Sequence, residues 1–556
     1  MVEDVGTDEV SDRRTMGDWL SRAWELVPIA LQKAKEVSRF PGRWKTIVSK
    51  LEEIPSRLSD LSSHPCFSRN VLCKEQLQVL CQTLGEAVCL AELCSMEKYE
   101  GKLQMQSDLD SLIGKLDLNL RDCELLIKTG VLGDVTTPNS TTESEASVHG
   151  NIRELLARLQ IGHLEAKHKA LDHLVEIFRE DEKKIVAALN QSSISALVQL
   201  LTATSPRVRE KTVTLICSLA ESQSYDDWLV SEGVLPPLIR LLESGSTVGK
   251  EKAAISLQSL SILAETSRAI VGNGGVRPLV EICQKGNSVS QVAAASTLKN
   301  LSAVPDVRQT LAEEGIVKVM IDILNDGILL GSKEYAAECL QNLTVSNETL
   351  RRLVVSENGV QSLLAYLDGP LPQEPAIAAI RNLVASVPIP TLISLGFLPH
   401  AAHVLKSGSA GAQQAAASSI CHICTLSDVK KLVGEAGCIP LLIRLLESKS
   451  SSGSEIAAQA ILSMITDSHN RREVKRDEKS IPNLVQLLDP SPHNTAKKYA
   501  VLCLGHLSSS KKCKKSMISY GAVGYLKKLA EMDVPGAKKL LERLERGKLR
   551  SLLARK

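Results

Sequence analysis

Aromatic residues are scarce in this chain: they make up 3% of the 556 residues, with four Trp and four Phe. Apolar residues still account for 44%, so Leu, Ile, Val and Ala must fill the interior. Such side chains suit closely packed helices better than a β-sandwich, which draws on aromatic and β-branched residues. A chain of this length is too long for one hydrophobic core, which predicts several domains or a repetitive architecture.

Long uncharged segments are also missing. The longest stretch without Asp, Glu, Lys or Arg runs from Asn382 to Leu405, and Pro388, Pro390 and Pro399 interrupt it. No transmembrane segment is therefore predicted. The first 15 residues are acidic and polar and lack the features of a secretory signal. The 14 cysteines are scattered through apolar helical patterns, which is typical of reduced thiols. We expect a protein that is not secreted and is cytoplasmic, nuclear or peripherally attached to a membrane.

The sequence contains no phosphate-binding glycine loop, no GxSxG motif and no HExxH motif. One cluster, Cys421-His422-Ile423-Cys424, resembles a pair of metal ligands. A structural zinc site needs four ligands, and no second pair lies at a suitable spacing, so we interpret these cysteines as packing residues. We therefore predict no enzyme activity, no cofactor, no metal and no small-molecule substrate.

A sequence motif that begins at a turn residue and ends in an apolar pair recurs along the chain. Gly233 opens GVLPPLIRLL, and Gly437 opens GCIPLLIRLL. The equivalent final apolar positions are 38 to 43 residues apart: Leu201, Leu242, Cys283, Leu324, Leu367, Leu405, Leu446, Leu488 and Leu529. A fixed period of this length predicts about nine stacked repeats. The segment that ends at Leu159 is predicted to be a partial capping unit.

Each repeat contains two further sequence motifs with helical spacing. A longer one has alanines at helical spacing, as in AAASTLKNLS from Ala293, and a shorter one precedes the glycine, as in RQTLAEEG. A glycine just past a helix is the expected stop signal. Three helices in each repeat predict an all-α fold.

These three sequence motifs together resemble the armadillo repeat over residues 151–532. A two-helix HEAT repeat of similar period is the close alternative. The resemblance implies a right-handed superhelical solenoid whose third helices line a concave groove. The related nuclear-import receptors, importin-α, carry Trp and Asn four residues apart in this groove. Here the Asn position is occupied by His173, Ser218, Ser259, Asn300, Asn342, Asn382, His422, Ser463 and His506, and no Trp occurs four residues earlier. The importin-like function is therefore excluded.

Three consecutive asparagines, Asn300, Asn342 and Asn382, form the centre of this polar ladder, with Ser259 and His422 on either side. An Asn side chain offers a donor and an acceptor to an extended peptide backbone. One hypothesis is that these five residues bind extended segments of other proteins. The alternative is that each Asn caps or bridges its own repeat.

The N-terminal part lacks the repeat. After an acidic and disordered segment at 1–15, we predict an antiparallel helical bundle at 16–133 and a polar linker at 134–150. Pro28 and Pro55 are expected to kink or split the first two helices. A bundle before armadillo repeats resembles plant U-box/armadillo proteins, but the U-box motifs are missing, as in the vacuolar-protein-8-like branch. The resemblance implies a scaffold or, alternatively, an adaptor in a ubiquitin-ligase pathway without ligase activity of its own.

Basic residues gather near the C-terminal end, although the formal net charge of the chain is only +2. Two predicted first helices carry Arg471, Arg472, Lys475 and Arg476, and then Lys511, Lys512, Lys514 and Lys515. A basic amphipathic helix is predicted at 533–556. It either caps the solenoid or contributes to a surface for an acidic partner or an anionic membrane. Nucleic acid is disfavoured because no aromatic residues alternate with these charges.

Overall fold

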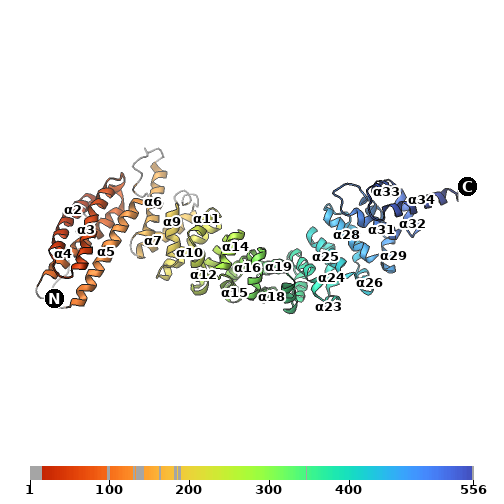
Figure 1. The fold of residues 1–556 in the computed structure, drawn as a ribbon, viewed down its shortest axis with the longest axis horizontal. Coiled ribbons are helices and arrows are strands. Elements are labelled where there is room, and N and C mark those ends of the chain that lie inside the picture. Colours follow the sequence, from red (N-terminus) through yellow and green to blue (C-terminus); the bar gives the residue numbers. More distant parts are fainter. Residues whose placement is uncertain are drawn as a thin grey trace. The chain divides into compact units, whose positions relative to one another are not determined.

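The computed structural model describes residues 15–96, 101–128, 132, 143–161, 164–180, 185, 189–345 and 347–553 (Figure 1). Its regular elements are helices, and no strand occurs within these residues. The chain divides into two compact units, Met1–Ser256 and Leu257–Lys556. The predicted disordered segment at 1–15 lies outside the described residues except for Thr15.

Four helices form the N-terminal bundle: α2 (Met16–Glu36), α3 (Pro41–Ser62), α4 (Val71–Ser95) and α5 (Lys102–Lys128). The turn η1 (Phe67–Arg69) precedes α4. Thr15 begins α2 with a reciprocal capping box to Asp18, and Asn70 caps α4. Both α2 and α3 continue through Pro28 and Pro55, so neither helix is split.

The bundle buries one apolar core. α2 packs against α3 and α4, and α5 packs against the same two helices. Leu51, Leu84 and Leu109 are fully buried there. By length and composition alone α4 could cross a membrane, but half of its most apolar window is buried inside the protein. α4 is thus packed as a core helix of the bundle.

Helix α6 (Glu143–Gln160) begins inside the stretch predicted as linker and joins the bundle to the first repeats. Ala157 and Ile161 belong to the core of the bundle. The Arg158 guanidinium donates to both carboxylate oxygens of Glu75, at 3.0 and 3.2 Å. The bundle and α6 therefore share one core within the N-terminal unit.

The remaining helices of this unit belong to the repeats: α7 (Leu164–Glu180), α9 (Gln191–Leu200), α10 (Pro206–Glu221), α11 (Asp226–Ser231) and α12 (Leu235–Ser244). Helix α13 (Thr247–Leu260) is the third helix of the repeat that begins with α11 and α12, and the boundary between the two units falls within it.

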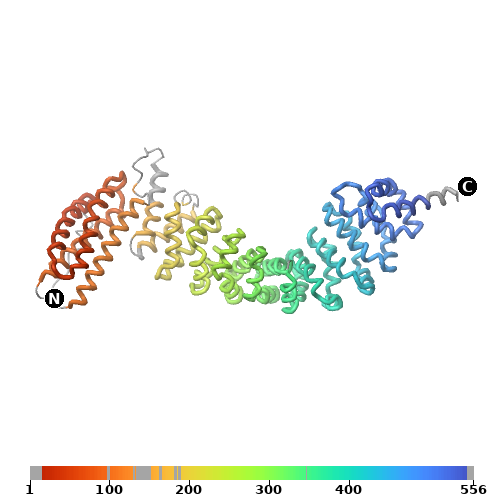
Figure 2. The backbone as a smooth tube through the Cα atoms, viewed as in Figure 1, coloured from red at the N-terminus to blue at the C-terminus, as the bar shows by residue number. Residues whose placement is uncertain are grey.

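The second unit continues the repeats (Figure 2). Its first helices are α14 (Ala264–Gly272), α17 (Arg308–Glu313), α20 (Glu348–Ser356), α23 (Ile389–Ser394), α26 (Ser427–Glu435), α29 (Ser468–Arg476) and α32 (Lys511–Ser519). Its second helices are α15 (Val276–Lys285), α18 (Ile316–Asp326), α21 (Gly359–Leu367), α24 (Phe397–Ser407), α27 (Cys438–Leu445), α30 (Ser480–Gln486) and α33 (Ala522–Glu531). Its third helices are α16 (Ser288–Ala303), α19 (Leu330–Thr344), α22 (Glu374–Leu383), α25 (Ala410–Ile423), α28 (Ser451–Met464) and α31 (Lys497–Leu507). The short turns η2 (Pro305–Val307) and η3 (Val384–Ser386) and the final helix α34 (Ala537–Leu553) complete the unit.

The recurring glycine separates the first and second helices because the backbone there is left-handed. Gly315, Gly396 and Gly437 have φ values of 81°, 88° and 74°. An L side chain is strained in this region, and glycine is not. Asn358 fills the equivalent place in one repeat at φ 62°, a conformation that Asn tolerates better than most residues.

The third helices pack against one another in chain order from α16 to α31. Buried alanines such as Ala294 and Ala337 lie between them and allow close approach. This confirms the prediction of an all-α solenoid. The continuous layer of third helices is the surface that holds the predicted asparagine ladder.

Candidate functional site

Each asparagine of the ladder bonds to the third helix of the preceding repeat. Nδ2 of Asn300 donates to Ser261 Oγ at 2.9 Å, and Nδ2 of Asn342 donates to Ser302 Oγ at 3.1 Å. Nδ2 of Asn382 donates to Thr344 Oγ1 at 3.2 Å. Each amide also reaches a backbone carbonyl of that helix at 3.4 or 3.5 Å. The bridge thus runs between neighbouring repeats and not within one repeat.

The carbonyl side of these amides differs along the ladder. Oδ1 of Asn382 accepts from the Arg381 guanidinium at 3.2 Å. Within the described part of the chain, no group donates to Oδ1 of Asn300 or Asn342. Both side chains are half-buried. The inter-repeat bonds of each Nδ2 hold the Oδ1 of the same amide in a fixed direction.

Charged and aromatic groups surround the ladder. Lys299 lies 3.5 Å from a Glu338 carboxylate oxygen and 5.5 Å from the centre of the Tyr335 ring. Ser259 is half-buried on α13, and His422 is exposed on α25. The five predicted residues therefore all lie on third helices, and the three asparagines share one bonding pattern.

Arginines of the first helices form a second inter-helix pattern, which the sequence analysis missed. Arg308 Nε donates to the Ser302 carbonyl at 2.7 Å, and Arg351 donates to the Thr344 carbonyl at 3.4 Å. Arg471 donates to the carbonyls of Ile465 and Thr466, both at 2.9 Å. These groups neutralise the carbonyl end of the preceding third helix. The sequence signal for this pattern is an Arg five or seven residues after the last residue of the third helix.

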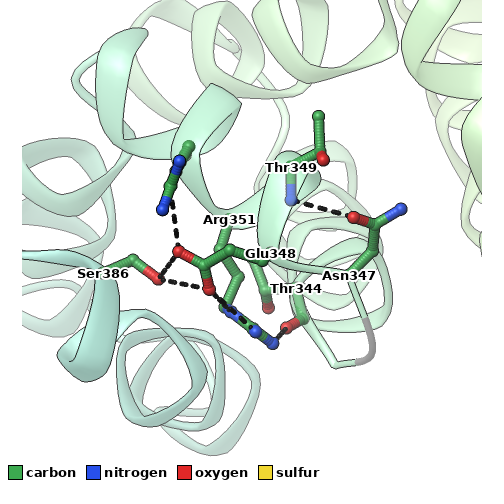
Figure 3. Close-up of polar contacts among 7 residues, drawn as sticks. Thr344, Asn347, Glu348, Thr349, Arg351 and Ser386 are labelled. Carbon is green, nitrogen blue, oxygen red and sulfur yellow. Dashed lines mark hydrogen bonds and ion pairs between the residues drawn. The ribbon is translucent and has the colours of Figure 1, made fainter.

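Figure 3 shows the polar network around Glu348, next to Thr344 at the end of the ladder. Glu348 accepts from Arg351 at 2.9 Å and from Arg352 at 3.0 Å. Ser386 donates to the same carboxylate at 3.3 Å, so the network links two successive repeats. The two guanidinium groups lower the pKa of Glu348 and keep it ionised.

The predicted basic residues near the C-terminal end have different surroundings. Arg472, Arg476, Lys511, Lys512 and Lys515 are exposed, and Lys514 is half-buried. Lys475 donates to Ser509 Oγ at 3.0 Å. Arg471 is the exception, because its guanidinium is occupied by backbone carbonyls.

The Cys421–Cys424 stretch lies on α25 and at its end. Burial raises the pKa of both thiols, that of Cys424 to about 12, so both stay protonated at neutral pH. The described side chains include no group of three or more His, Cys, Asp or Glu that could hold a metal ion. The chemistry that this surface offers is hydrogen bonding and charge.

Comparisons with known proteins agree with this geometry. Residues 260–533 match the family described as "Plant U-box protein ARM repeat region". Residues 21–131 match the family described as "Domain of unknown function (DUF7032)". No curated protein matches the chain.

Two solved structures are similar. A structural genomics consortium's crystal structure of an engineered protein is 24% identical, with a TM-score of 0.61; the match covers 71% of this chain and 98% of that one. A designed armadillo repeat protein is 21% identical, with a TM-score of 0.38; that match covers 41% of this chain and 98% of the other.

Proposed function

Because the chain is an armadillo-repeat protein of the plant U-box type, we propose that it is a non-enzymatic scaffold that binds extended segments of other proteins along its third helices. The observation that carries the proposal is the pair of oriented acceptors, Oδ1 of Asn300 and Oδ1 of Asn342. Each can accept an N–H from a partner backbone.

The spacing of these acceptors suits an extended chain. Packed helices lie about 8–10 Å apart. An extended chain advances about 3.3 Å per residue. A partner segment would therefore meet successive asparagines about every third residue, and the charged pair Lys299 and Glu338 lies beside this path.

A second candidate is an adaptor in a ubiquitin-ligase pathway, without ligase activity of its own. The match to the repeat region of plant U-box proteins favours it. Removal of the chain would then raise the level of a partner protein, whereas a simple scaffold would leave that level unchanged.

The cytoplasm or the nucleus is the proposed compartment. All 14 cysteines are free thiols, and 11 of them are buried. Unpaired thiols are usual where the cell keeps thiols reduced.

The test uses a partner isolated with the full chain and trimmed to its binding segment. The N300A/N342A variant removes both acceptors and should weaken the Kd about tenfold, since each lost hydrogen bond costs about 0.5–1.5 kcal/mol. The matched control, S261A/S302A, removes the inter-repeat acceptors of the same two amides but leaves Oδ1 in place. It should bind nearly as well as the unchanged chain, because each amide keeps its bond to the backbone carbonyl of Gln258 or Lys299, which still orients Oδ1.

A further inference from the structure

A small cavity lies at the C-terminal end of the stack of third helices. Helices α31 and α34 line this open cavity of about 290 Å³, and its lining includes Leu502, His506, Lys539 and Arg543. Ala537, Leu540 and Leu544 of α34 are buried, so the helix is packed firmly over the last repeat. The cavity is therefore bounded by two packed elements and not by a loose end.

Positive groups dominate this cavity. Lys539 and Arg543 from α34 line it together with His506 from α31, and the lining residues that the structure describes include no acidic side chain. Arg543 donates one N–H to the Gly505 carbonyl at 3.3 Å, which leaves its other donors for a ligand. Lys539 and Arg543 are both solvent-exposed, so an anion can reach them.

The positive field acts on His506 itself. Desolvation by the surrounding protein and the charges of Arg471 and Arg543 lower the pKa of its imidazole. Arg471 comes from α29 and Arg543 from α34, so two helices direct positive charge at His506. An anion in the cavity would relieve the repulsion among these groups.

The cavity is in register with the asparagine ladder. His506 occupies on α31 the position that Asn300, Asn342 and Asn382 occupy on α16, α19 and α22. An extended segment that follows the third helices toward the C-terminal end would reach this point.

We propose that the cavity between α31 and α34 is an anion-binding subsite that holds a carboxylate or phosphate group of a bound protein segment. The proposal rests on the proposed scaffold function and adds the chemistry of one end of the ligand. Lys539 and Arg543 bind the oxyanion, and His506 donates a hydrogen bond to it.

The probe is a fluorescein-labelled peptide of eight glutamates, measured by fluorescence anisotropy on the full chain. A peptide of eight glutamines is the uncharged control. The K539Q/R543Q variant should weaken binding of the glutamate peptide at least tenfold. The control variant K511Q/K512Q removes the same charge from exposed positions of α32 and should weaken binding less than threefold.

Equal losses in both variants would overturn the proposal, because general electrostatic attraction would then explain the binding. Unchanged binding by K539Q/R543Q would overturn it as well. If thermal melting shows that this variant is misfolded, H506Q/K539Q keeps the Arg543 bond to Gly505 and carries the same expectation.

Two further arms identify the source of the anion. A phosphoserine peptide of the same length distinguishes phosphate from carboxylate. Binding of either peptide that is weakened by K539Q/R543Q supports the subsite. Vesicles containing phosphatidylserine test a membrane instead. Vesicle binding that is weakened by K539Q/R543Q, without binding of either peptide, would contradict the proposal. The proposed scaffold function fails separately, if N300A/N342A binds its partner segment normally.

Discussion

Asp122 is a buried acid at the joint between the bundle and the first repeats. It is 5% exposed, and its Oδ1 has no hydrogen-bond partner. Burial raises its pKa to about 6, against the opposing effects of Arg121 and Lys167. The ionised form is thus unfavourable in the folded state.

The substitution Asp122→Asn is expected to stabilise the N-terminal unit at pH 7 by on the order of 2 kcal/mol. The folded pKa is above the unfolded value of about 3.9, so the contribution of Asp122 to stability is full below about pH 4 and lost as the pH rises through about 6. The advantage of the variant should therefore vanish below about pH 4.

Tryptophan fluorescence during urea unfolding measures this effect, because Trp19, Trp24 and Trp44 lie in α2 and α3. Trp228→Phe removes the remaining Trp signal. Equal urea midpoints for Asp122→Asn and the parent chain at pH 7 would show that the buried carboxylate of Asp122 does not destabilise the fold.

The positions of the ladder asparagines could be predicted from the sequence because the repeat period fixes their register. Their bonding partners could not. Ser261, Ser302 and Thr344 lie 38 to 40 residues from the asparagines they contact. Only the stacking of third helices brings these residues together, and no local pattern encodes that distance.

At the scale of elements, Arg471 and Arg472 are adjacent on α29 but have different surroundings. Arg471→Gln removes two bonds from a charged donor to the end of α28 and should destabilise the C-terminal repeats by about 1–3 kcal/mol. Arg472→Gln changes an exposed side chain and should cost less than about 0.5 kcal/mol. Thermal unfolding of the two variants gives the comparison, and equal losses would contradict the capping role of Arg471.

Helix α6 is predicted to unfold together with the bundle. Ile161 is 4% exposed within the bundle core, although it lies beyond the predicted boundary at residue 133. Ile161→Ala should destabilise the tryptophan-reported transition by about 2–4 kcal/mol, because it leaves a cavity in that core. An unchanged transition in the Trp228→Phe background would mean that α6 and the bundle are independent.

Helix ends were easier to predict than the junction between the bundle and the first repeats. Glycines at left-handed positions such as Gly315 and Gly437 mark the end of the first helices. The start of α6 could not be predicted, because Ser/Thr-rich composition at 134–150 favours a linker. Burial of Ala157 and Ile161 against the bundle depends on contacts that composition does not record.

At the scale of the whole molecule, stability should be the sum of the repeats and their interfaces. Truncation from Gly536 onward removes Leu540 and Leu544, which are buried against the last repeat. Amide hydrogen exchange should then increase in α31 and α33 and stay unchanged in α16 and α19. Unchanged protection in α31 would show that α34 is not a cap.

The central claim is that the oriented asparagine acceptors of the third helices bind a partner segment. Calorimetric titration of that segment into the unchanged chain, N300A/N342A and S261A/S302A tests it most directly. The expected result is a Kd about tenfold weaker for N300A/N342A and nearly unchanged for S261A/S302A. Equal affinity of all three proteins, or an equal loss in both variants, would contradict the claim.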